Sequence, residues 1–341
     1  MPQRKILLLA LAITALVPAS ASAAPSVTAT GDTGQPVPLN TTAPVGLRNM
    51  DVTASVVVPA ADAAAAPGYR TQVVDQANVP ASSASPCRAT EFGPTWNNYA
   101  NYRGNQTYTV VVRYYANDDC TGAATRQFLF RYAISAGIAV TAPPTKLLTR
   151  APNSFVTNTH QIAVGLNPGA STYEVRYALG GVVGPDGAIS GPSAESFLDS
   201  TTGLAPVRFD KPGSYVIVAR AQRNTFFTPW SPAVNVNAIA PFDLERVTFP
   251  DFRGPRYKLR GRVRERVARG KVSIAIAKRW KKGKFRSIGK ARINSKGRFT
   301  KRFRVSGYGK YRLRYTYRGS NLVAPGRVTV RITISKRYFF R

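Results

Sequence analysis

The 341-residue sequence predicts an all-β protein built from several β-sandwich domains in tandem. After residue 23, apolar and polar residues alternate in short runs, which is the pattern of a half-buried strand. Gly, Pro, Asn and Asp interrupt these runs at intervals of about 8–12 residues, a spacing typical of sandwiches and barrels. The apolar period of about 3.6 residues that indicates an amphipathic helix is almost absent.

Residues 1–23 have the composition of a cleaved secretory signal peptide. Arg4 and Lys5 precede twelve largely apolar residues, and residues 21–23 read Ala-Ser-Ala, a small-residue cleavage site. A membrane span needs about 20 apolar residues, and no later stretch approaches that length. We therefore expect a mature chain from Ala24 that is secreted, extracellular or associated with the cell wall, with no integral membrane span.

The two cysteines, Cys87 and Cys120, are predicted to form a disulfide. They are the only cysteines of the chain, and an oxidising compartment favours their pairing. Closing the loop between them would stabilise the fold by about 3–4 kcal/mol in the chain-entropy model. A zinc site is the weaker interpretation, because two cysteines without neighbouring histidines leave zinc short of ligands. We expect no metal.

Two proline-bearing segments, 141–145 and 238–242, divide the mature chain into three parts. We expect a β-rich domain with the disulfide over 24–140, a second sandwich over 145–240 and a third over 241–341. Proline stiffens such joints.

Positive charge is concentrated in the last of these parts. The net charge of the chain is +32, and residues 241–341 hold 32 of the 48 Lys and Arg but only four of the 16 acids. This step in composition also marks the clearest domain boundary.

Two parts resemble known families. The stretches YEVRYA (173–178) and GSYVIVARAQRNTFFTPWSPAVNV (213–236) resemble strands of fibronectin type III domains. The Trp expected in that family's second strand is missing, so a bacterial immunoglobulin-like domain is the alternative. INSKGRFTKRFRV (293–305) followed by GKYRLRY resembles bacterial immunoglobulin-like and carboxypeptidase-regulatory-like sandwiches. The resemblances imply a secreted bacterial protein of tandem immunoglobulin-like sandwiches, used as spacers or adhesive modules.

The strongly basic part divides into seven strand-like segments. Assigned in order to an immunoglobulin arrangement, the first, second, fourth and fifth form one sheet and the others a second sheet. The segments are 243–248, 256–265, 271–280, 284–293, 297–305, 309–318 and 326–335.

Alternation predicts one basic sheet face as a polyanion-binding surface. Phe285 and Phe299 are expected in the core, and Lys301 falls on the inward side, which suggests a bulge or an edge position. The outer face of the other sheet is expected to carry fewer charged side chains. The predicted face comprises Lys258, Arg260, Arg262, Arg264, Lys290, Arg292, Arg298, Arg302 and Arg304.

The sequence favours a binding protein over an enzyme and predicts no cofactor. Its single histidine, His160, is expected to face solvent, on the side opposite Ile162 and Val164. The adjacent Asp118 and Asp119 read as turn residues rather than a carboxylate pair. No G-x-S-x-G turn, P-loop or dinucleotide-binding glycine pattern is found. An accessory enzyme would need a pocket with two carboxylates within reach of each other.

Three interpretations of the charge remain open. The basic face can dock on an anionic cell-envelope polymer or an acidic polysaccharide, because Arg binds phosphate and carboxylate in a bidentate manner. It can bind extracellular DNA, with Trp280 stacking on bases. Or it serves only solubility, in a structural spacer with no specific ligand.

Overall fold

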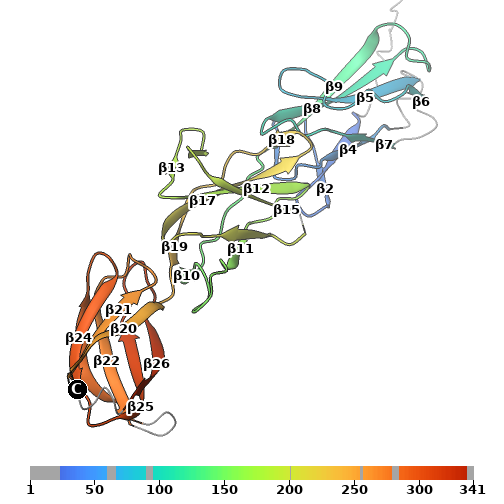
Figure 1. Ribbon diagram of the computed structural model, residues 1–341. Coiled ribbons are helices and arrows are strands. Elements are labelled where there is room, and N and C mark those ends of the chain that lie inside the picture. Colours follow the sequence, from blue (N-terminus) through green and yellow to red (C-terminus); the bar gives the residue numbers. More distant parts are fainter. Residues whose placement is uncertain are drawn as a thin grey trace, which may run out of the picture. The chain divides into compact units, whose positions relative to one another are not determined.

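A computed structural model of the chain describes residues 24–59, 67–89, 95–199, 201–253, 256–278 and 284–335. In these ranges every secondary-structure element is a strand, β1 to β26, which confirms the all-β prediction (Figure 1). The described part of the chain contains no helix long and apolar enough to cross a membrane. The expected signal peptide lies outside the described residues.

The N-terminal sandwich uses β1 to β9 in two sheets, ordered β2-β1-β4-β7 and β3-β9-β8-β5-β6. Its core includes Tyr108 and Tyr132, whose rings stack at 5.3 Å. The strands are β1 (Ser26–Thr30), β2 (Pro36–Pro38), β3 (Val45–Leu47), β4 (Thr53–Val57), β5 (Gly68–Val74), β6 (Arg88–Ala89), β7 (Thr95–Tyr99), β8 (Thr107–Tyr115) and β9 (Ala124–Ile134).

The disulfide prediction is confirmed, since Cys87 and Cys120 are bonded with their Cα atoms 5.6 Å apart. The bond ties the start of β6 to the turn between β8 and β9. In that turn, Asp119 Oδ1 accepts hydrogen bonds from the backbone N (2.9 Å) and the hydroxyl (2.8 Å) of Thr121. These bonds hold the pKa of Asp119 below its usual range. Asp119 is a turn residue, as expected.

The middle sandwich has a main sheet ordered β10-β19-β17-β12-β15 and a second sheet of β11 and β16. The stretches that resemble fibronectin type III, now β12, β17 and β19, are neighbours in the main sheet. The strands are β10 (Leu147–Leu148), β11 (Thr159–Ala163), β12 (Thr172–Leu179), β13 (Val182–Val183), β14 (Ile189–Ser190), β15 (Ala194–Asp199), β16 (Leu204–Arg208), β17 (Gly213–Arg223), β18 (Phe226–Phe227) and β19 (Val234–Ile239).

The expectation that His160 faces solvent is wrong. His160 is half-buried, its Nε2 lies 2.7 Å from the carbonyl oxygen of Leu148, and its ring centroid lies 5.8 Å from that of Phe209. Residues two apart in a strand share a face, so His160 points to the same side as buried Ile162. It is a packed side chain of the middle sandwich.

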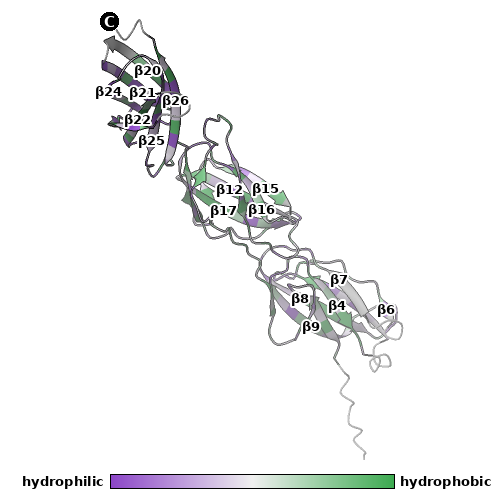
Figure 2. Cartoon of the chain, turned by 90° about the horizontal axis from the view of Figure 1, so that it is seen from below, coloured by the Kyte–Doolittle hydropathy of each residue, from purple (hydrophilic) through white to green (hydrophobic). Residues whose placement is uncertain are grey.

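The C-terminal sandwich packs the sheet β20-β21-β24 against the sheet β23-β22-β25-β26. Polar and apolar residues alternate along its strands (Figure 2). Tyr257, Leu259, Leu313 and Tyr315 are among its fully buried core residues. The strands are β20 (Leu244–Arg253), β21 (Arg256–Val263), β22 (Gly270–Lys278), β23 (Arg286–Ile293), β24 (Arg298–Arg304), β25 (Gly309–Tyr317) and β26 (Gly326–Ile334).

The expected sheet assignment of the fourth strand is wrong, because β23 pairs with β22 and not within the sheet of β24. Seven residues connect β22 to β23. Strands joined by so short a connection usually pair as an antiparallel hairpin. The immunoglobulin order, with four strands in the sheet of β21, would have required the chain to cross to the other sheet at this point.

Lys301 lies at the sheet edge that the sequence suggested. It occupies the inward side of β24, the edge strand of its sheet, between the buried rings of Phe299 and Phe303. Its Nζ donates to the carbonyl oxygen of Lys290 at 3.5 Å. It passes so close to Gly289 that a Cβ there would lie 2.6 Å from Nζ. The bulge is in the facing β22–β23 pair, where Gly289 has a φ of +104°.

We expect Gly261→Ala to destabilise the C-terminal sandwich by about 1–3 kcal/mol, the usual cost of overpacking. Gly261 faces Phe299 across the β21–β24 pair, and a Cβ would overlap the Phe299 ring. Calorimetric unfolding of the intact protein measures the loss. The control is Gly137→Ala, where a Cβ meets no atom within 4 Å. Equal losses in the two variants would contradict the packing argument.

Candidate polyanion-binding site

Like charges face each other across β21 and β24. Tyr257 and Leu259 on β21 and Phe299 and Phe303 on β24 are buried, so the residues between them lie on the outer face of the sheet. Such pairs are mildly destabilising, by up to about 1 kcal/mol each. The opposed pairs are Arg256 with Arg304, Lys258 with Arg302, and Arg262 with Arg298.

Strand β20 completes a hollow on this outer face. It brings Arg246 opposite Arg262 and Thr248 opposite Arg260. Short threonine side chains lie between longer arginines, and the space above them measures about 620 Å³. We call this the first hollow. The residues that line it are Arg246, Thr248, Arg260, Gly261, Arg262, Asn294, Arg298, Phe299 and Thr300.

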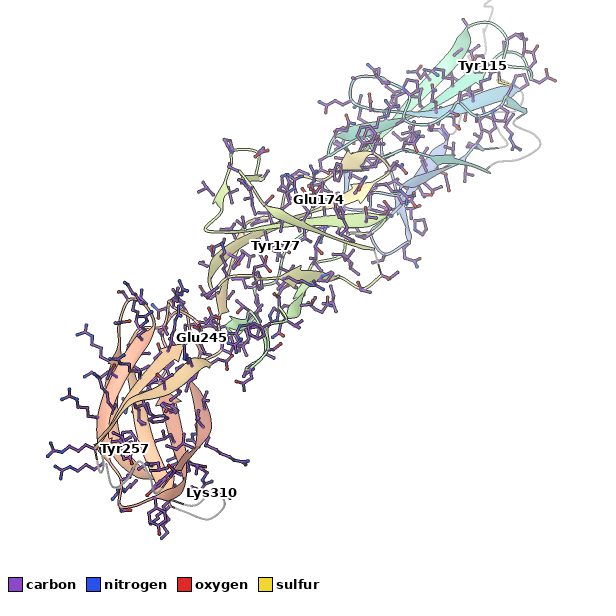
Figure 3. The ribbon with its side chains drawn as sticks, viewed as in Figure 1. Tyr115, Glu174, Tyr177, Glu245, Tyr257 and Lys310 are labelled. Carbon is purple, nitrogen blue, oxygen red and sulfur yellow. A yellow bond between two sulfur atoms is a disulfide. The ribbon has the colours of Figure 1, made fainter. Side chains whose placement is uncertain are left out.

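One acid lies beside the first hollow. Glu245 contacts Arg262, with Arg262 Nη1 at 3.2 Å from Oε1 and Nε at 3.1 Å from Oε2. Figure 3 shows Glu245 and, on the side of the sandwich where β24 lies, projecting side chains that end in nitrogen. Both side chains of this ion pair are partly exposed, so the pair adds little stability and an external anion can compete with Glu245.

The structure brings six of the nine predicted residues to one face. Lys290 and Arg292 lie on β23, in the other sheet, opposite Ser273 and Lys271. Arg264 follows the end of β21, where its guanidinium carbon lies 4.1 Å from the ring centroid of Phe155. These three placements correct the expected face. The six that share it are Lys258, Arg260, Arg262, Arg298, Arg302 and Arg304.

The sheet that was expected to carry fewer charges also has many basic side chains on its outer side. Phe285 lies there, half-buried, with the guanidinium carbons of Arg312 and Arg314 at 4.9 and 4.2 Å from its ring centroid. Its expected place in the core is therefore wrong, whereas Phe299 is buried as predicted. The basic residues of this side are Lys271, Lys290, Arg292, Arg312, Arg314, Arg327 and Arg331.

Two further acids of the basic part are engaged at the joint with the middle sandwich, which belongs to the same compact unit. Buried Arg150 donates to Asp243 Oδ2 at 2.6 Å and to Glu265 Oε1 at 2.7 Å. Burial acts to lower the pKa of Arg150, but its bonds to Asp243 and Glu265 outweigh burial and raise that pKa. Neither carboxylate lines the first hollow, so neither neutralises the arginines there.

A buried carboxylate that sequence reasoning missed lies in the middle sandwich. Glu174 accepts from Arg176 Nε at 2.6 Å and from Arg220 Nη2 at 2.6 Å, so both of its oxygens are engaged. The two arginines lie over the ring of Trp230, with guanidinium carbons 5.1 and 4.4 Å from its centroid. This cluster is structural. Among the described residues, no group of three or more His, Cys, Asp or Glu could hold a metal ion.

No protein-family model and no curated protein matches the chain. Among solved structures, it is similar to a tetra-tandem repeat in the extending region of a large adhesion protein, at 11% identity and a TM-score of 0.30, covering 92% of each chain. It is also similar to the FN1–FN3 domains of chicken CNTN1, at 11% identity and a TM-score of 0.24, covering 85% of this chain and 98% of the other. TM-scores this low do not define the fold, which rests on the sheet pairing above.

We expect Glu174→Gln to destabilise the middle sandwich by about 3–5 kcal/mol, because it leaves two partly buried arginines without a full countercharge. Glu195→Gln is the matched control. Glu195 also contacts Arg176, at 3.1 Å, but it is exposed, and its loss should cost less than about 1 kcal/mol. Calorimetric unfolding compares the two variants, and similar losses would show that burial of Glu174 does not matter.

Proposed function

We propose that the protein is a secreted, surface-associated binding protein, with a binding rather than a catalytic role. Its basic C-terminal sandwich docks on an anionic polymer of the cell envelope. The observation that carries the proposal is the set of opposed like charges across β21 and β24. An anion that occupies an acid-poor surface of this kind relieves the repulsion between its positive charges and so lowers the free energy of the folded protein.

Phosphate-bearing polymers suit the chemistry of the first hollow. An arginine guanidinium presents its donors as a fork that matches phosphate oxygens. Four arginines converge on the first hollow, with threonine hydroxyls and Asn294 between them. Because such binding releases counterions, its affinity must fall steeply with salt.

The disulfide supports an extracellular location, because such bonds persist in oxidising compartments. The expected signal peptide supports it as well. In this proposal the N-terminal and middle sandwiches act as spacers or adhesive modules.

Extracellular DNA and acidic polysaccharides are the competing ligands. Stacking on bases was expected of Trp280, which lies outside the described residues. Oligo(dT) and polygalacturonate, compared with sodium polyphosphate at matched charge, therefore test the choice of ligand. Tighter binding of oligo(dT) would favour the nucleic-acid function, and no binding of any polymer would favour a structural spacer.

We expect the triple variant R246Q/R260Q/R298Q to bind polyphosphate at least tenfold more weakly at low ionic strength. Three phosphate contacts are lost, so the slope of log K against log salt should fall by about 2–3. All three residues are exposed in the intact protein, so the fold should persist. Titration calorimetry over a salt series measures both quantities.

The charge-matched control is K146Q/R208Q/K211Q, which removes three exposed positive charges from the middle sandwich. It should bind polyphosphate like the original protein. If the control loses as much affinity, or if bound protein stays on polyphosphate in molar salt, docking at the first hollow is wrong.

A further inference from the structure

The second sheet of the C-terminal sandwich has a basic hollow of its own. It measures about 360 Å³ and lies where β22, β23 and the end of β25 meet. We call it the second hollow. The residues that line it are Arg269, Gly270, Lys271, Ser273, Lys290, Tyr317, Arg318 and Gly319.

The charges of the second hollow come from different elements. Lys271 on β22 and Lys290 on β23 lie on the outer side, where Lys290 is directly opposite Ser273 and Lys271 comes two residues before Ser273 on the same strand. Arg318 follows β25. All three side chains are exposed, so a ligand in solution can reach them.

The wall of the second hollow is held in place by hydrogen bonds. Arg269 Nη1 donates to the carbonyl oxygens of Arg266 at 2.6 Å and Ala268 at 3.1 Å. The hydroxyl of Tyr317 donates to the carbonyl oxygen of Arg269 at 2.6 Å. The loop before β22 and the end of β25 are therefore fixed together, and the hollow exists before any ligand arrives.

The two hollows lie on opposite outer faces, with the hydrophobic core between them. Arg260 and Arg298 belong to the sheet β20-β21-β24, and Lys271 and Lys290 to the sheet β23-β22-β25-β26. Packed sheets are about 10 Å apart, and outward side chains add to the distance. The screening length is about 8 Å at physiological salt, so anions bound in the two hollows repel each other only weakly. A short polymer chain cannot fill both.

We propose that the C-terminal sandwich is bivalent, holding one phosphate-bearing polymer chain in each hollow and cross-linking the two. This inference rests on the proposed function and deepens it. The first hollow is rich in arginine and binds tightly. The second hollow offers two lysines and Arg318, since Arg269 Nη1 is bonded to backbone carbonyls, and it binds more weakly because Lys cannot grip phosphate with a planar fork. The protein then joins neighbouring polymer chains as well as being retained by them.

Energy transfer between two pools of short polyphosphate, one labelled with a donor and the other with an acceptor, tests the cross-linking. The intact protein should raise energy transfer as it is added. Transfer should fall again when protein exceeds polymer, because each chain then has its own protein. Titration calorimetry should give two chains per protein at saturation.

The variant K271Q/K290Q/R318Q removes three positive charges from the second hollow and leaves the first hollow unchanged. It should bind one chain with an affinity within about twofold of the original tight site, and energy transfer should be lost. The variant R246Q/R260Q/R298Q should lose both tight binding and transfer, whereas K146Q/R208Q/K211Q should keep both.

The outcomes separate the two proposals. Tight binding of one chain by the intact protein, without energy transfer, overturns bivalency and leaves the docking function standing. Undiminished energy transfer by K271Q/K290Q/R318Q likewise overturns the claim that the second hollow binds a polymer chain. Absence of any polyphosphate binding overturns both.

Discussion

The concentration of positive charge on the β21–β24 face is the constraint on which the C-terminal sandwich depends. Arg256, Lys258 and Arg262 each face another cation across the strand pair. This arrangement costs stability in the free protein, because like charges opposite each other repel. The cost is tolerable because the side chains on the reverse of the same strands are deeply buried, among them Tyr257 and Leu259. Core packing and surface repulsion are thus set on opposite sides of the same two strands.

Most of the charge stays available because two of the four acids of residues 241–341 lie at the joint, while Asp251 on β20 lies opposite Lys258. Asp243 and Glu265 are taken up by Arg150 at the joint, and Glu245 contacts Arg262. The segment that leads from β19 into the C-terminal sandwich is buried as well, with Ala240 and Phe242 almost fully covered. Phe242 stacks on Tyr317 at 4.9 Å. The proline-bearing segment 238–242 is therefore a packed joint, and Asp243 and Glu265 are held there rather than on the outer faces.

Much of this architecture could be predicted from alternation, and the failures have physical causes. Alternation along a single strand gives the buried side, as it did for Phe299, and two cysteines in an otherwise cysteine-free chain identify the disulfide. Which sheet receives β23 is decided by pairing and by the short β22 connection, so Lys290 was assigned to the wrong face. Phe285 packs against two arginines outside the core, a contact that apolar patterning does not encode. The first hollow depends on the register of three strands, and no single strand carries that signal.

Amide hydrogen exchange of the intact protein, with and without short polyphosphate at matched ionic strength, tests most directly whether an anion relieves the repulsion across β21 and β24. A ligand that binds the folded state stabilises it, and exchange reports where. Polyphosphate is predicted to slow exchange in β21 and β24 and to leave exchange in the N-terminal sandwich unchanged. Unchanged exchange in these strands, or equal slowing along the whole chain, would contradict the claim that this face is an anion-binding surface.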